Sequence, residues 1–478
     1  MARNQRVPKI DVNDKRLRKM AHLLDEMVED ELGQDATFEE ESDAAAELVG
    51  KAHWLREEWK FRHLTTTAAE VEVAGVKYSR MEQPSSAVYF GRYGAHEVTE
   101  PLYRQIGVRN GPTVKPVEAR LGIIGNLTPD LARIVSEHGA HDNSRETERQ
   151  LLLHGLVSPS RAVIERRQTQ IAHAIKAQVA HLEASARGVT PVPDKVATVS
   201  CGMDRMAVRM IEPANDDTDR PRRRTEPYER TPPDPKDYPY RMAWVGSVSA
   251  HDEKGELLHT WRYALDAQAA PGTIARRICA QVTAITDGRP EVRVHCIQDE
   301  GKELKVLPDM LEAKLDDATK LVKLTDLQHL LGYLEDVVDA CEPEGDPRNF
   351  KLWFRAELLN HDDAIDRIWD QLKRRAGLAK RGDAKARNAI GAALSYIRKR
   401  KHKMRYATHY AAHRPIGSGE TENTCGQMQT RVKRRGQSWE IPGLSGILSL
   451  RSLVLSGSWE AAWSVFAAQQ RKKVRRVR

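Results

Sequence analysis

Acidic residues at three distant points of the chain could support a metal-dependent reaction. Asp204 lies inside the run KVATVSCGMDRMAVRMIEP, Asp299 follows EVRVHCIQ, and Glu420 and Glu422 lie in RPIGSGETEN. Breaking a phosphodiester bond requires charge stabilisation on both the attacking and the leaving oxygen. Two divalent ions about 4 Å apart provide it when acidic ligands bridge them. Carboxylates suit Mg²⁺ or Mn²⁺, because these hard cations prefer oxygen ligands.

The third acidic point is followed directly by cations. A helix that starts after Gly417-Ser418-Gly419 would set Glu420 and Glu422 about 200° apart around its axis, so only one of them can face the other acids. The cations that follow are Arg431, Lys433, Arg434 and Arg435. At two to four turns beyond the acids, they are expected to contact the phosphates of a bound nucleic acid.

Two further basic stretches stand in the C-terminal part of the chain. The run YIRKRKHKMR contains Arg398, Lys399, Arg400 and Lys401 and is a candidate for phosphate contacts; a solvated helix face is the alternative. The final run RKKVRRVR, residues 471–478, is predicted to be a disordered basic arm that adds nonspecific affinity.

The composition agrees with a polyanionic partner. The 478 residues include 40% hydrophobic and 30% charged residues, with a net charge of +8, so nucleic acid is the first candidate partner. The five cysteines form no CxxC pair and no spacing typical of zinc, so neither a disulfide framework nor a zinc site is predicted. Neither a membrane helix nor a signal peptide is evident, and we expect a cytoplasmic, nucleoid-associated protein without membrane contact.

The segments around the acids predict the elements that must position them. From residue 195 the pattern gives a strand, a hairpin that turns at Lys254-Gly255, a helix from Pro271, a strand that ends at Asp299, a helix, and a strand that runs into a helix near Thr325. This order predicts an α/β fold with a mixed sheet flanked by helices, as in an RNase H-like core. In such a core the first and fourth strands are adjacent, so Asp204 and Asp299 can meet.

The rest of the chain divides by composition. The predicted parts are a mainly helical region at 1–190, a first part of the core at 195–330 with a mobile insertion at 213–240, a helical insertion at 331–412, the C-terminal helices of the core at 413–465, and a basic tail at 466–478. Within the N-terminal region at 1–190, the pattern of residues 70–110 predicts short strands. The run ETERQLLLHGLVSPSRAVIERR fits either a DNA-reading helix-turn-helix or two packed helices.

Several of these residues also have structural explanations. Asp299 could cap the helix that follows it, and Glu422 could be a solvated helix residue. Thr325 and Gln328 have the spacing of a capping box, in which case Asp326 and His329 are ordinary residues of the first turn. The tryptophans of WFRAELLNHDDAIDRIWDQLKRR, residues 353–375, are predicted to belong to a core.

The motifs around these acids resemble a known family. VSCGMDRMAVRM, HCIQDEGKELKVL, KLTDLQHLLGYL, RPIGSGETENTCGQMQTRVKRRGQSW and ILSLRSLVLSGSWEAAW are similar to segments of the Mutator-like DDE transposases of bacterial insertion sequences. The resemblance covers roughly residues 195 to 465, and its most specific part is Pro415–Glu422. It implies that Asp204, Asp299 and Glu422 are the catalytic acids, and it matches Asp326 and His329 to the C/D-x-x-His signature of the family.

The resemblance also implies an activity and its partners. The three acids would bind two Mg²⁺ ions, for which Mn²⁺ can substitute, and would cleave and transfer DNA strands of an insertion sequence. The partners would be double-stranded terminal inverted repeats and target DNA, with a homodimer or larger assembly on DNA. Two alternatives stay open: an inactive or domesticated transposase-derived DNA-binding protein, and an RNase H-like nuclease or resolvase.

Overall fold

The computed structural model describes residues 14–32, 36–213, 236–299, 301–341, 347–378 and 383–477. The chain divides into two compact units. The first unit comprises the residues up to 135, residues 143–167 and those from 467 onward; the second comprises residues 136–142 and 168–466. None of the described helices is both long and apolar enough to span a bilayer.

The chain enters the first unit through two helices, as predicted for this region. They are α1 (Lys15–Leu32) and α2 (Phe38–Leu64). Thr37 caps α2, because its hydroxyl accepts the Glu40 N–H while the Glu40 carboxylate accepts the Thr37 N–H. The other helices up to the second sheet are α3 (Pro116–Leu121), α4 (Pro129–His141), α5 (Ser144–Leu153), α6 (Arg161–Ala177) and α7 (Val179–Val189).

The first unit is built on an antiparallel sheet of five strands. In spatial order these are β12 (Val474–Arg476), β1 (Glu70–Val73), β2 (Val76–Phe90), β3 (Ala95–Gln105) and β4 (Thr113–Val114). The predicted strands at 70–110 are confirmed, but β2 and β3 form a long hairpin rather than short strands. The prediction of a disordered C-terminal arm is wrong, because Val474–Arg476 pairs with Val71–Val73. The unpaired edge of β1 offers the backbone of this tail a full set of hydrogen bonds.

Strand β3 buries a carboxyl group against the start of α3. Glu100 is 1% exposed. Its Oε2 accepts the Val117 N–H at 3.3 Å, and within the described part of the chain its Oε1 has no hydrogen-bond partner. Burial raises the pKa of Glu100 to about 7. The folded state therefore retains a proton that the unfolded chain releases near pH 4.5.

This carboxyl group predicts a pH dependence of stability. Because its folded pKa is raised, its stabilising contribution is present at low pH and is lost as the pH rises to about 7. We expect wild type to lose on the order of 2–3 kcal/mol relative to Glu100→Gln between pH 5 and pH 8. Urea unfolding at pH 5 and pH 8 measures the free energy of unfolding of both proteins. Hydrogen exchange in peptides of α3 and β3 shows whether the change is located at this carboxyl group. Parallel pH profiles for the two proteins would contradict this prediction.

The second unit contains a mixed sheet of five strands. In spatial order these are β11 (Leu321–Thr325), β10 (Arg293–Gln298), β5 (Thr198–Arg209), β8 (Tyr240–His251) and β9 (Leu257–Leu265). Strands β5, β8 and β9 are antiparallel neighbours, whereas β10 runs parallel to both β5 and β11. The predicted hairpin turn is present, with Gly255 at a φ of 78°. An α/β fold with a mixed sheet flanked by helices is thus observed.

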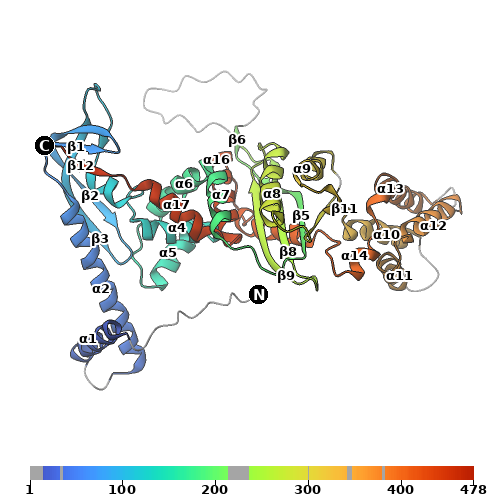
Figure 1. Ribbon diagram of the computed structural model, residues 1–478, viewed down its shortest axis with the longest axis horizontal. Coiled ribbons are helices and arrows are strands. Elements are labelled where there is room, and N and C mark those ends of the chain that lie inside the picture. The colour runs from blue at the N-terminus through green and yellow to red at the C-terminus, as the bar shows by residue number, and fades with distance from the viewer. Residues whose placement is uncertain are drawn as a thin grey trace, which may run out of the picture. The chain divides into compact units, whose positions relative to one another are not determined.

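Helices cover both faces of this sheet. Figure 1 shows α8 (Pro271–Thr286) lying along β8 and β9. On that face Val199, Met203 and Val248 pack with Ile274 and Ile278 in an apolar core. The opposite face contacts α15 (Gly419–Val432) and α16 (Ile441–Leu455). The remaining helices around the core are η1 (Lys302–Lys305), α9 (Val306–Lys314), η2 (Ala318–Lys320) and α17 (Trp459–Gln470).

Helices occupy the chain between β11 and α15, where the sequence predicts a helical insertion. Its helices are α10 (Leu327–Cys341), α11 (Pro347–Asn360), α12 (Ala364–Leu378), α13 (Ala384–Arg400), η3 (Lys401–Lys403) and α14 (Ala407–Ala411). They share an apolar core that includes Phe354, Ile365 and Ile368. Trp369 packs against this core, whereas Trp353 is 37% exposed, so the core prediction fails for Trp353.

The predicted mobile insertion at 213–240 is ordered at both ends. Residues 212–213 form β6 (Glu212–Pro213) and pair with β7 (Lys236–Asp237), while β8 begins at Tyr240. The Glu212 carboxylate also pairs with Arg241. The prediction is therefore wrong for these ends, because backbone pairing and an ion pair fix them. Residues 214–235 lie outside the described residues.

Candidate active site

The register of β5 and β10 sets the first two acids level with each other. The last registered pair of these parallel strands is Cys201 with Cys296. Asp204 and Asp299 each lie three residues beyond it. Equal spacing along neighbouring parallel strands keeps residues level and on the same face. Both carboxylates therefore lie at one level of the sheet, where β10 has ended and Asp204 is exposed.

Helix α15 approaches the same face through a glycine. A Cβ at Gly202 would lie 2.4 Å from the Ile297 carbonyl oxygen and 2.8 Å from the Thr421 Oγ1. The Thr421 hydroxyl shares a hydrogen bond of 2.8 Å with Ser247 of β8. Gly202 and Asp204 point to the same side of β5 because they are two residues apart. The missing side chain of Gly202 thus lets the first turn of α15 rest on the face that displays Asp204.

A cysteine connects Asp204 to α15. The Cys425 thiol donates to Asp204 Oδ2 at an Sγ–O distance of 3.9 Å. Burial, followed by the charge of Asp204, raises the pKa of Cys425 to about 12, so this group stays a neutral thiol. Glu422 lies three residues earlier on the same helix, and residues at this spacing are neighbours on a helix surface. Asp204 and Glu422 therefore border the same stretch of α15.

The two glutamates of α15 point to different surroundings. The Ser418 hydroxyl donates to Glu422 Oε1 at 2.9 Å, and Glu422 is exposed. In contrast, Glu420 Oε2 accepts from the Thr260 hydroxyl of β9 at 3.3 Å. This matches the prediction that only one of the two can face the other acids. Glu422 is the one on the side of Asp326 and His329.

Asp326 fixes the loop that precedes α15. Its carboxylate is fully buried. Oδ1 accepts the Ser418 N–H at 2.8 Å, while Oδ2 accepts the His329 N–H at 3.1 Å and contacts His329 Nδ1 at 2.7 Å. Asp326 thus caps α10 and positions Ser418, which in turn orients Glu422. The alternative of a capping box at Thr325 is wrong, because Thr325 ends β11 and its buried hydroxyl has no hydrogen-bond partner among the described residues.

His329 is charged at neutral pH in this environment. The hydrogen bond with Asp326 raises the pKa of His329 to about 9, against an opposing effect of burial, and the charges of Asp299 and Glu422 add to the rise. Although burial opposes ionisation of Asp326, its hydrogen bonds with His329 and Ser418 lower its pKa. The result is an imidazolium beside three carboxylates.

Among the described residues, one group of three side chains has ligand atoms close enough for a single cation. It consists of Asp326, His329 and Glu422, whose ligand atoms lie within 4.8 Å of one another. Asp204, Asp299 and Glu422 are not grouped as closely in the described chain. An imidazolium has no lone pair for a metal, so the raised pKa favours His329 as a counter-charge to carboxylates or phosphate rather than as a ligand. Carboxylate oxygens are the donors here that fit Mg²⁺ or Mn²⁺.

The helical insertion contributes a tyrosine to the second acid. The Tyr396 hydroxyl of α13 donates to Asp299 Oδ1 at 3.2 Å. Tyr396 is buried, stacks on Tyr333 with ring centroids 4.3 Å apart, and has the Arg400 guanidinium 4.1 Å from its ring centre. The tyrosine therefore restrains Asp299 from the insertion side.

Removing this hydroxyl should weaken the function of Asp299 without removing the acid. We expect Tyr396→Phe to lower metal-dependent activity about tenfold and to raise the metal concentration required, because one hydrogen bond to a charged group contributes roughly 1.5 kcal/mol. Activity measured against Mg²⁺ concentration tests this. Tyr333→Phe is the matched control, because it removes a hydroxyl from the stacked partner ring and leaves Asp299 untouched. Equal losses in the two variants would indicate an effect of ring packing alone.

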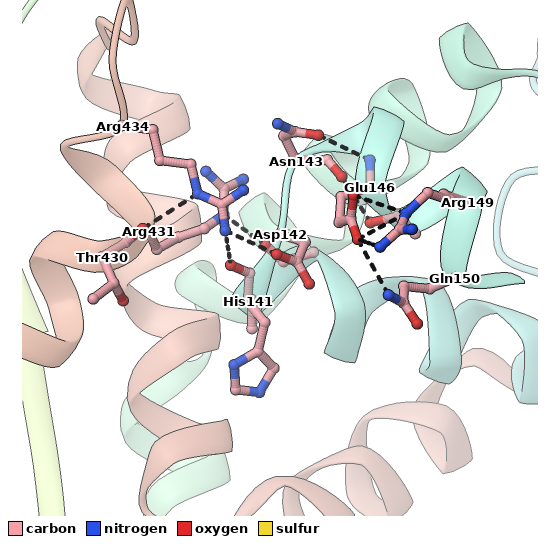
Figure 2. A network of polar contacts seen from close by, with 12 residues as sticks. His141, Asp142, Asn143, Glu146, Arg149, Gln150, Thr430, Arg431 and Arg434 are labelled. Carbon is pink, nitrogen blue, oxygen red and sulfur yellow. Dashed lines mark hydrogen bonds and ion pairs between the residues drawn. The ribbon is translucent and has the colours of Figure 1, made fainter. Parts of the chain in front are cut away.

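Half of the predicted DNA-contacting cations have partners within the protein. Arg431 is buried, donates to the Gly139 carbonyl oxygen at 2.9 Å and stacks over Trp439. The prediction of a phosphate contact is wrong for Arg431, because its side chain is enclosed. Figure 2 shows Arg434 directed at the His141 carbonyl oxygen and the Asp142 carboxylate, both at 2.8 Å.

The cations at the end of α13 and the start of η3 divide in the same way. Arg400 covers Tyr396, and Lys401 forms an ion pair with Asp366. The exposed cations of the two predicted stretches are Arg398, Lys399, Lys433 and Arg435. These four are the ones free to meet a phosphate backbone, while Arg400, Lys401 and Arg434 would have to exchange an internal partner for it.

Sequence reasoning missed three residues that shape the site. Tyr396 begins the basic run YIRKRKHKMR, but nothing in that run points to Asp299, which lies 97 residues away. Gly202 stands out as a glycine inside a strand, which is a known signal of close backbone approach. The only sequence signal for Cys425 is its position three residues after Glu422, which places both side chains on the same side of a helix.

Comparison with known proteins returned no match, neither to a family model nor to a curated protein.

Proposed function

We propose that this chain is a metal-dependent DDE transposase that cleaves and joins DNA at the terminal inverted repeats of an insertion sequence. The observation that supports this most is the placement of Asp204 and Asp299 at one level of adjacent parallel strands, with Glu422 on a helix over the same face. A structural role alone gives no reason for three acids to border one face of the sheet, because like charges repel one another.

The order of the strands supports an RNase H-like core. Three antiparallel strands in sequence, β5, β8 and β9, are followed by β10, which joins the sheet beside β5. The helical insertion comes between β11 and α15, before the third acid. Both features support the proposal for residues 195–465, the part of the chain that resembles Mutator-like transposases.

In this proposal each residue has a defined task. Asp204, Asp299 and Glu422 would hold two Mg²⁺ ions, which supply charge stabilisation at the attacking and leaving oxygens. Ser418 orients Glu422, Asp326 fixes Ser418, and Tyr396 restrains Asp299. The imidazolium of His329 offers positive charge to a non-bridging phosphate oxygen. Arg398, Lys399, Lys433 and Arg435 are left to contact the DNA backbone.

A cleavage and strand-transfer assay tests the proposal. The substrate is a labelled duplex that contains the inverted repeats flanking the coding region, with an unlabelled plasmid as target. We expect nicking at the repeat ends that requires Mg²⁺ or Mn²⁺, followed by joining of the freed 3′ end to the plasmid. Metal-dependent cutting without joining would favour an RNase H-like nuclease or resolvase. Repeat binding without cutting would identify a transposase-derived DNA-binding protein.

A further inference from the structure

Helix α1 exposes an apolar face that the rest of the described chain does not cover. Val28 is the only buried residue among its 18. Met20, Leu23 and Met27 are 67%, 56% and 45% exposed. Their spacing of three and four residues places them on one side of the helix. An exposed apolar stripe of this kind is typical of a surface that binds another protein.

The charges of α1 are arranged against the intrinsic preference of a helix. The cations of its first half are Lys15, Arg16, Arg18 and Lys19, and the acids of its second half are Asp25, Glu26, Glu29, Asp30 and Glu31. Acids favour the N-terminal end of a helix and cations the C-terminal end, yet the first turn of α1 has no acid and its last turn no base. Within the helix these charges oppose the dipole, although the Asp14 carboxylate caps the N-terminus by accepting the Arg16 and Leu17 N–H groups at 2.8 and 3.4 Å. Charges of opposite sign on a neighbouring helix would stabilise both ends of α1.

A second copy of the same helix supplies that interaction when it runs antiparallel. If the two helices cross at Leu23, Lys15 lies opposite Glu31 of the second copy, and Arg16 lies opposite Asp30 of the second copy. Two-fold symmetry then repeats both pairs. The same crossing brings the stripes of Met20, Leu23 and Met27 together. A parallel pairing would instead oppose like charges at both ends.

The contacts that Glu31 makes within its own chain leave it available to pair with a second copy. It approaches Lys51 of α2 at 4.0 Å, but Lys51 has a closer partner in Glu47 at 2.8 Å. We propose that α1 is a self-association surface, which pairs antiparallel with α1 of a second copy about a two-fold axis at Leu23. The inference rests on α1 alone and does not depend on the proposed function.

Sedimentation velocity of the full chain without DNA, at about 10 µM and moderate salt, tests this pairing. We expect a dimer for wild type and a monomer for M20E/L23E. A monomeric wild type, or a M20E/L23E variant that remains dimeric, would overturn the proposal. Circular dichroism of each variant verifies that helix content is retained.

Charge exchange tests the antiparallel orientation. K15E/R16E and D30K/E31K should each weaken association by on the order of tenfold or more, because both symmetric sets of pairs become repulsive. The combined variant K15E/R16E/D30K/E31K should dimerise again, but not with wild type. Each exchange improves agreement with the helix dipole, so loss of the helix cannot account for a monomer. A combined variant that stays monomeric would overturn the antiparallel pairing.

Discussion

Conversion of Asp204, Asp299 or Glu422 to its amide should lower metal-dependent DNA cleavage by about 10³-fold or more, with DNA affinity near that of wild type. An amide has nearly the shape of the carboxylate but no negative charge, so it binds a divalent cation poorly. The folded state should tolerate the change, because Asp204 and Glu422 are exposed and Asp299 is only half-buried. Single-turnover cleavage and a filter-binding assay in Ca²⁺ separate the two effects.

Glu420→Gln is the matched control for Glu422→Gln. Both residues lie in the first turn of α15, but Glu420 contacts Thr260 of β9 rather than the acidic cluster. We expect Glu420→Gln to retain activity within about threefold. A greater loss for Glu420→Gln than for Glu422→Gln would assign the third acid to the other glutamate. Full activity of any of the three amide variants would refute the catalytic triad.

Gly202→Ala should be among the most destabilising single substitutions in the second unit. The added methyl group would overlap the Ile297 carbonyl oxygen at 2.4 Å, and this oxygen belongs to the backbone of β10. We expect a loss of about 2–3 kcal/mol, because backbone in a sheet has little freedom to move away. Cleavage should fall as well, because α15 must lift from the sheet and take Glu422 with it.

A second glycine of the same site provides the control. Gly426 lies inside α15, and apart from the backbone of this helix no atom of the described residues comes within 4 Å of an added Cβ. Gly426→Ala should stabilise the helix by about 0.5–1 kcal/mol and leave cleavage unchanged. Thermal unfolding, together with hydrogen exchange in peptides of β5 and β10, compares the two variants. If Gly202→Ala matched Gly426→Ala in stability and activity, the close approach of α15 to β5 would be refuted.

The local elements of this protein could be predicted from its sequence. Alternating apolar residues identify β5, turn chemistry at Lys254-Gly255 identifies the β8–β9 hairpin, and Pro271 marks the start of α8. These signals are local, because each depends on the periodicity or the backbone preference of a few neighbouring residues. The candidate acids were found in the same way, from their positions relative to those elements.

Only the tertiary structure decided which charged groups are free. Arg431 and Lys433 are two residues apart in one basic run, yet Arg431 is buried against Gly139 and Lys433 is exposed. Likewise the C-terminal basic run forms β12, because β1 offers it an unpaired edge. Neither outcome can be read from composition, since each depends on a segment hundreds of residues away.

For the acidic site, too, some features followed from the sequence and others only from the tertiary structure. The sequence by itself determined which acids lie at the ends and turns of elements that a fold can bring together. The tertiary structure decided that Gly202 admits α15, that Asp326 and Ser418 direct Glu422, and that Tyr396 from the insertion reaches Asp299. The physical reason is range: propensity and periodicity act between near neighbours, whereas hydrogen bonds and excluded volume at the site join residues up to 221 positions apart.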